Sequence, residues 1–257
     1  MAAILDNKDP KAVSVFQPAA LLREARRQKG LPAVDVPAVC ILDPDGDIVR
    51  RLRKEGRAKP FDGWPCYHTQ LDTFELAGRT VGIVGCAVGA PFAVLIAEEL
   101  FASGCRLLLS LTSAGQIVAA GPTPYFVIID RALRDEGTSY HYAAAADYGE
   151  ADPALVALAT GAIKAQGGNA IVGASWTTDA PFRETPQAIE AAKARGILAV
   201  EMEAAALYTF AKARRVHVLC LAHVTNTMAV AERDFEKGEA DGTTDALRVL
   251  EAIVSKA

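Results

Sequence analysis

The sequence predicts an α/β fold with one domain, in which a mixed, mostly parallel central sheet is flanked by helices. Two observations carry this prediction. Short apolar runs that are typical of buried strands alternate with stretches of helical periodicity, and the connections between them are short. The chain has 257 residues, 51% of them hydrophobic, which is enough for one full core. We therefore expect one domain over residues 1–257, with residues 1–36 as an N-terminal helical extension.

Local signals place the elements in chain order. Pro18 and Gly30 delimit a helix over residues 19–29, because proline favours a first helical turn and glycine ends a helix. The apolar run at 39–42 predicts the first strand, which an acidic turn at 43–47 closes, followed by a basic helix at 48–55. Further strands are expected at 80–84, 106–111, 125–130, 169–173, 196–200 and 216–224. Further helices are expected at 90–103, 153–166, 186–195, 200–214 and 243–255.

Composition narrows the function classes. The net charge of −4 and the absence of an evident basic face argue against a nucleic-acid-binding scaffold. Five cysteines without Cys-x-x-Cys spacing predict reduced thiols and no metal site. The N-terminus does not resemble a signal peptide, and no apolar stretch approaches the roughly 20 residues of a membrane span. We expect a cytoplasmic protein without a membrane partner.

The most informative segment is Val200-Glu201-Met202-Glu203, where an apolar run passes into an alanine-rich helical pattern. In an open α/β sheet, a ligand crevice is expected at such a strand-to-helix join. An extended backbone would aim Glu201 and Glu203 at the same face, and a carboxylate there can accept both hydrogen bonds of a vicinal diol. Met202 would offer a soft surface to a sugar ring. The alternative is a first helical turn with acids near the helix dipole.

Residues 200–208, Val-Glu-Met-Glu-Ala-Ala-Ala-Leu-Tyr, closely resemble the ribose-binding segment of the nucleoside phosphorylases of the uridine phosphorylase type. That superfamily also contains purine nucleoside phosphorylases and methylthioadenosine nucleosidase. Glycine turns at 81–91 and 112–117, a loop at 134–142 and a loop at 176–185 are similar to the family's segments in the same order. The resemblance runs from about Pro37 to the C-terminus and implies a three-layer α/β/α fold.

The resemblance also implies roles for individual residues. It makes Glu203 the catalytic residue that holds the ribose hydroxyls, with Met202 against the ribose and Glu201 as a supporting ligand. Ser113 and His141 complete the expected ribose site, Arg183 and Asn226 are further catalytic candidates, and the base site would comprise Trp176, Phe182, Arg183, Glu184 and Asn226.

The base-side residues leave the base itself open. The loop at 176–185 has no glutamine, which uridine-specific relatives place there, and Arg183 with Glu184 is equally compatible with a surface ion pair. Asn226 stands where purine-directed relatives place an aspartate. Because an amide cannot serve as a proton reservoir, Asn226 favours a pyrimidine. His223 nearby is expected to be a core histidine.

The expected phosphate site departs most from the family. Leu42-Asp43-Pro44-Asp45-Gly46-Asp47 replaces the family's Gly-Asp-Pro turn, and the arginine that follows it is displaced. We predict Gly46, Arg50 and Ser113 as phosphate ligands, with Arg51 as an alternative to Arg50. Asp45 and Asp47 would oppose phosphate unless they point away. A calcium loop is a minor alternative, because position 12 counted from Asp43 is Lys54 rather than a glutamate.

Three functions follow from these residues. The leading hypothesis is phosphorolysis of a uridine-like ribonucleoside to base and ribose 1-phosphate, with phosphate as co-substrate and no cofactor. The second is hydrolysis on the same scaffold, and the third is nucleoside binding without catalysis. The family implies a homodimer or a ring of dimers as the assembly.

Overall fold

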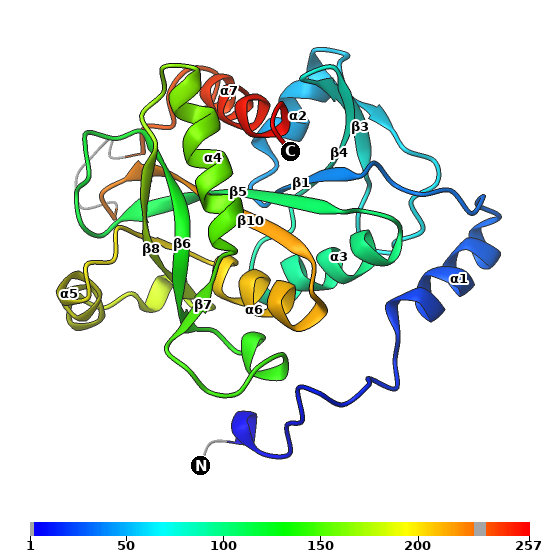
Figure 1. The fold of residues 1–257 in the computed structure, drawn as a ribbon, viewed down its shortest axis with the longest axis horizontal. Coiled ribbons are helices and arrows are strands. Elements are labelled where there is room, and N and C mark those ends of the chain that lie inside the picture. The colour runs from blue at the N-terminus through cyan, green and yellow to red at the C-terminus, as the bar shows by residue number, and fades with distance from the viewer. Residues whose placement is uncertain (1–2, 229–234) are drawn as a thin grey trace.

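The helices cover two faces of a central sheet (Figure 1). The computed structural model describes residues 3–228 and 235–257. The helices α3 (Ala90–Ala102) and α6 (Ala204–Arg214) pack on one face, and α2 (Asp47–Lys54), α4 (Pro153–Ala165) and α7 (Thr243–Val254) on the other. Outside these layers lie α1 (Pro18–Lys29), α5 (Pro186–Ala194) and the 3-10 turns η1 (Ala3–Leu5), η2 (Ser139–His141) and η3 (Pro181–Arg183). This arrangement is the three-layer α/β/α fold that the sequence predicts.

The sheet is mixed, and part of it closes on itself. Its strands are β1 (Val39–Asp43), β2 (Lys59–Pro60), β3 (Asp72–Leu76), β4 (Arg79–Gly85), β5 (Leu107–Gln116), β6 (Tyr125–Asp135), β7 (Tyr148–Glu150), β8 (Ile171–Thr178), β9 (Ala199–Glu201) and β10 (His217–Asn226). They follow the order β10-β6-β8-β9-β5-β1-β4-β3-β2, and β10 also pairs with β5. The strands β5, β10, β6, β8 and β9 therefore form a closed ring, from which β1 to β4 extend.

Side-chain alternation explains why both faces need helices. Along β1, Ile41 packs with the core under α2 and α7, whereas Leu42 packs with the core under α3 and α6. Ile83 and Val84 of β4 divide in the same way. Because successive side chains of a strand point to opposite faces, a strand that is buried on both sides is a continuous apolar run.

Most predicted elements are present, and the differences are three short strands that were not expected and the ends of other strands. The sequence missed β2, β3 and β7, since they are short and β3 begins with a polar residue, Asp72, that is buried beside Arg53. Residues 112–116 are strand rather than the expected turn, and β8 continues to Thr178. The longest ladders, β5–β10 and β6–β8, are parallel as predicted, but β9 runs antiparallel to β5.

The chain before the sheet forms a long arm that ends in α1. Lys8 on this arm lies 3.0 Å from Nδ1 of His141, so the arm crosses the molecule next to η2. Among the described residues, no helix is both long and apolar enough to cross a membrane.

Candidate functional site

The strand pairings bring some of the predicted site residues to one rim of the ring. Ser113 of β5 is in register with His223 of β10, and Gly115 is in register with Asn226. Gly115 also faces Val200 of β9, which leads directly into Glu201 and Glu203. The polar ends of β5, β9 and β10 therefore share one location, as expected for an α/β crevice.

Glu203 is buried and only half satisfied by the protein. Its side chain is 1% exposed, and Oε1 accepts a hydrogen bond of 2.7 Å from the backbone N–H of Gly89, which precedes α3. Its other oxygen, Oε2, is buried without a hydrogen-bond partner among the described residues. Burial and the nearby carboxylates of Glu201 and Asp45 raise the pKa of Glu203 to about 8, against the opposite effects of the Gly89 N–H and the nearby Thr112 hydroxyl. A buried orphan acceptor is costly, so this oxygen is a candidate ligand atom.

Glu201 has a different role from Glu203, although both side chains are buried. Its carboxylate accepts hydrogen bonds from the hydroxyls of Ser175 and Thr177 and from the backbone N–H groups of Glu203 and Ala204. Both oxygens are therefore occupied, and they tie β8 to the first turn of α6. The expectation that the two glutamates face a sugar together is corrected, because β9 ends at Glu201 and the chain then turns into α6.

The base side of the rim is formed by Asn226, Met228 and Gly115. The Asn226 amide oxygen accepts a hydrogen bond from the Met228 backbone N–H, and its Nδ2 donates to Thr225. A Cβ on Gly115 would lie 2.5 Å from the Met228 sulfur. The glycine is thus needed for Met228 to cover this part of the rim. The sequence analysis did not single out Met228, whose position after β10 was the available signal.

The expected base loop is only partly at the rim. Trp176 is on β8, 5% exposed, and packs in a small core with Ile197 and Val200. Its Nε1 donates to Asp135, so the predicted open aromatic wall is instead a core side chain. Phe182 is 98% exposed and points to solvent rather than providing a wall.

The two charged residues of this loop, Arg183 and Glu184, differ in their exposure to solvent. Arg183 and Glu184 lie in and directly after η3. Arg183 is exposed, while partial burial raises the pKa of Glu184 to about 7.

The acidic turn points into the expected phosphate site. The Asp45 carboxylate accepts hydrogen bonds from the backbone N–H of Ser113 at 2.8 Å and from its hydroxyl at 3.1 Å. The N–H of Gly46 donates to Asp43. Arg50 donates to the Asp45 carbonyl and to the Asp47 carboxylate. Thus Gly46, Arg50 and Ser113 all bond to the turn's own acids, which corrects their prediction as open phosphate ligands.

The remaining charges near the turn are also paired. Lys237 and Arg50 both bind Asp47, and Arg51 points away to Thr243 and Thr244 on α7. Burial raises the pKa of Asp43 to about 7. Sequence reasoning missed Lys237, because no local pattern indicates that it reaches a turn 190 residues earlier.

His223 and His141 occupy different environments. His223 is buried, stacks on Phe126 with ring centroids 4.4 Å apart, and has its pKa lowered to about 4 by burial and by Lys237. It is therefore the neutral core histidine that the sequence favours. His141 lines an apolar cavity of about 380 Å³ beside α3, together with Phe16 of the arm. That cavity does not include Glu203, so His141 belongs to a separate location in this protomer.

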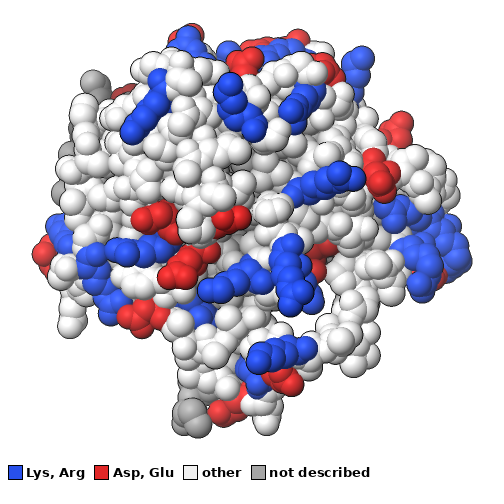
Figure 2. Space-filling view, in the orientation of Figure 1, with Lys and Arg blue, Asp and Glu red and all other residues white. Residues whose placement is uncertain are grey.

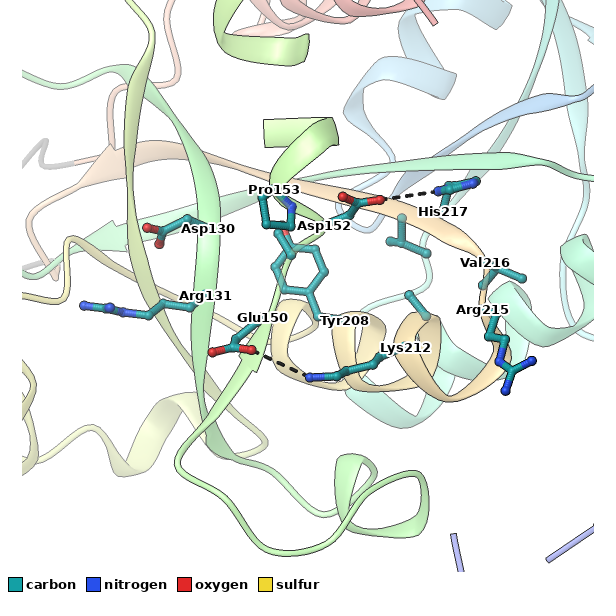
Figure 3. Close-up of a pocket in the computed structure, with 13 residues that line it drawn as sticks. Asp130, Arg131, Glu150, Asp152, Pro153, Tyr208, Lys212, Arg215, Val216 and His217 are labelled. Carbon is teal, nitrogen blue, oxygen red and sulfur yellow. Dashed lines mark ion pairs between the residues drawn. The ribbon is translucent and has the colours of Figure 1, made fainter. Parts of the chain in front are cut away.

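A further cavity lies away from this rim (Figure 3). It has a volume of about 690 Å³ and opens between β6, β7, α6 and the start of β10. Four of its charged side chains form two ion pairs, Glu150 with Lys212 and Asp152 with His217, drawn as dashed lines. None of Glu203, Ser113 and Asn226 lines it. We therefore place the candidate site at the rim.

Surface charge and metal-binding groups add little to the site. On the face in Figure 2, basic and acidic side chains are interspersed, with a dense basic group over α1. Within residues 3–228 and 235–257, no group of three or more His, Cys, Asp and Glu side chains is arranged to hold a metal ion. The acidic turn at residues 43–47, for which a calcium site was the alternative interpretation, forms no such group either.

Comparison with known proteins is consistent with this geometry. The family model described as the phosphorylase superfamily matches residues 38–255. A DeoD-type purine nucleoside phosphorylase from Roseobacter denitrificans is 30% identical over 162 residues, which cover 60% of this chain and 67% of that protein. Another from Streptococcus uberis is 26% identical, covering 69% of this chain and 77% of that protein.

The fold agrees as well. The crystal structure of a uridine phosphorylase from Vibrio fischeri matches with a TM-score of 0.73 at 23% identity, covering 87% of this chain and 94% of that one. The chain belongs to the phosphorylase superfamily. The relatives named here are nucleoside phosphorylases, and the chain shares their fold.

Proposed function

We propose that the protein cleaves the N-glycosidic bond of a ribonucleoside and that Glu203 holds the ribose hydroxyls. The observation that carries this proposal is the Oε2 atom of Glu203, which has no hydrogen-bond partner within residues 3–228 and 235–257 although the side chain is only 1% exposed. A vicinal diol supplies two donors to one carboxylate, which would remove the penalty of a buried orphan acceptor. The anion would also stabilise the positive charge that develops on the sugar as the bond breaks.

Glu201 acts in this proposal by fixing Glu203. Its bonds to the N–H groups of Glu203 and Ala204 hold the first turn of α6 in place. Glu203 then reaches Gly89, so its carboxylate is held between α6 and α3. Met202, half-buried between the two acids, is proposed as the surface under the sugar ring.

A pyrimidine is the proposed base. Asn226 is buried at the end of β10 and can donate to or accept from a base edge, but it cannot deliver a proton. A uracil leaving group needs hydrogen bonds to its carbonyl oxygens more than it needs protonation. Arg183 and Glu184 remain proposed contacts from the loop after β8, for which a change of loop conformation is required because Arg183 is exposed.

Two molecules, phosphate and water, are candidates for the acceptor of the ribosyl group. Family membership supports phosphate, with ribose 1-phosphate as the product and no further cofactor. The Asp45 carboxylate at Ser113 supports water, because it occupies donors that a phosphate would use. A homodimer or a ring of dimers is the proposed assembly, and sedimentation velocity measures it.

Base release from a panel of nucleosides tests the proposal. Chromatography would follow the free base with the parent chain and with Glu203→Gln. Glu190→Gln, an exposed glutamate on α5 that pairs with Lys193, is the matched control. The proposal predicts release by the parent and the control and its loss in Glu203→Gln. Equal release by all three chains would refute the role of Glu203.

A further inference from the structure

Asp45 is bonded to a residue of the expected anion site and acts electrostatically on the proposed ribose ligand, Glu203. Both of its carboxylate oxygens bind Ser113, one at the backbone N–H and one at the hydroxyl. Its charge is also among the causes that raise the pKa of Glu203. The Asp45 carboxylate therefore occupies the Ser113 donors of the expected anion site, and it is close enough to Glu203 to act on its charge.

The backbone holds this carboxylate in place. Asp43 accepts hydrogen bonds from the N–H groups of Gly46 and Val49, so the turn is anchored to the start of α2. Gly46 has a left-handed backbone, and a Cβ there would lie 2.5 Å from the Cys86 sulfur and 2.7 Å from Nη1 of Arg50. The turn therefore requires glycine at position 46.

The local charge balance opposes a second anion. Asp45 and Asp47, with the buried Asp43 whose pKa is raised to about 7, face two cations, and both cations already bind Asp47. Arg51, the other candidate for a guanidinium fork, forms an ion pair with Glu55 and bonds to α7. A phosphate dianion would have to displace Asp45 and then remain beside it, which like-charge repulsion disfavours.

We propose that Asp45 is the residue that determines the acceptor, as a tethered anion that excludes phosphate and leaves water as the nucleophile. This inference rests on the proposed cleavage of a nucleoside. In the reaction, the water oxygen bonds to C1′ of the ribose while the C1′–N bond breaks. The base leaves with that electron pair, and the proton lost by the water balances the proton that the base takes up. The products are free ribose and free base.

The binding of inorganic phosphate tests the exclusion without any nucleoside. Isothermal titration would compare the parent chain with Asp45→Ala, Asp45→Asn and Asp47→Asn, after thermal melts have established that each variant is folded. Asp47→Asn is the comparison variant, because it removes one charge from the same turn and releases Arg50 and Lys237 but leaves Asp45 on Ser113. The inference predicts no measurable binding by the parent and an affinity at least about tenfold higher in Asp45→Ala than in Asp47→Asn.

Asp45→Asn keeps the size of the side chain and tests the charge alone, so it is expected to bind phosphate more weakly than Asp45→Ala. Tight phosphate binding by the parent chain would overturn the inference. Equal affinities in Asp45→Ala and Asp47→Asn would also overturn it, since general charge rather than occupancy of Ser113 would then be the cause.

The nucleoside assay separates this inference from the proposed function. Base release by the parent that requires phosphate would overturn the inference and leave the proposed function standing. Phosphate binding that appears only in the Asp45 variants, with no base released from any nucleoside, would support the exclusion and refute the proposed function.

Discussion

The ribose side and the anion side of the candidate site each hold a carboxylate, and the protein uses the two differently. Glu203 receives one hydrogen bond from Gly89, and its second oxygen is buried without a partner among the described residues. Asp45 is bonded through both oxygens to Ser113. Hydrogen-bonding capacity that the protein leaves unused is available to a ligand, whereas capacity that it uses internally is closed. The proposed ribose ligand, Glu203, can therefore accept a further hydrogen bond, whereas the Ser113 donors of the expected anion site already bind Asp45.

Removal of Glu203 should give the largest effect. Hydrogen bonds to a charged group contribute about 1.5–3 kcal/mol each, so losing two of them in Glu203→Ala should lower kcat/KM by about a thousandfold. Steady-state base release measures this value. A decrease of less than about tenfold would mean that ribose is held elsewhere.

Glu203→Gln separates the loss of activity from unfolding. The pKa of Glu203 is raised in the folded chain to about 8, so its contribution to stability is present below the unfolded value near 4.5 and is lost as pH rises through about 8. Glu203→Gln should consequently be at least as stable as the parent at pH 8 and above. Thermal melts of the two chains at that pH check this expectation.

Glu201 provides a second comparison with Glu203. Its carboxylate is also buried, but both of its oxygens already accept hydrogen bonds from the protein. Glu201→Ala would leave two backbone N–H groups without their acceptor, at a cost of about 2–5 kcal/mol in the free energy of unfolding. Glu201→Gln should cost far less, since it keeps one oxygen for those groups and the hydroxyls of Ser175 and Thr177 can turn to accept. Denaturant unfolding compares the two variants, and equal losses would contradict the capping role.

The pH dependence of nucleoside cleavage should give the smallest effect. If ionised Glu203 is the form that accepts both ribose hydroxyls, kcat/KM should rise about tenfold per pH unit below its pKa and level off near pH 8. Neutral His223, with its pKa near 4, should not contribute in this range. A profile that is flat between pH 6 and 9 would exclude the titration of Glu203 from the rate.

The sequence predicted the layers of the fold and the position of the Glu-Met-Glu segment, because apolar periodicity reports burial directly. It did not distinguish Glu201 from Glu203. Their difference depends on where β9 ends and on Gly89, which lies 114 residues earlier. The Asp45–Ser113 bonds likewise require β1 and β5 to be neighbours in the sheet. Trp176 was assigned to a loop, since the length of β8 is set by its pairing with β6 rather than by its own residues.

The sugar product formed in the presence of phosphate tests the central claim most directly. A nucleoside that the parent chain cleaves would be incubated in excess inorganic phosphate, and the sugar would be identified by ³¹P and ¹H NMR. An open Glu203 beside a filled anion site predicts free ribose and no phosphate ester. Ribose 1-phosphate as the main product would contradict the account, because phosphate would then have displaced the Asp45 carboxylate from Ser113.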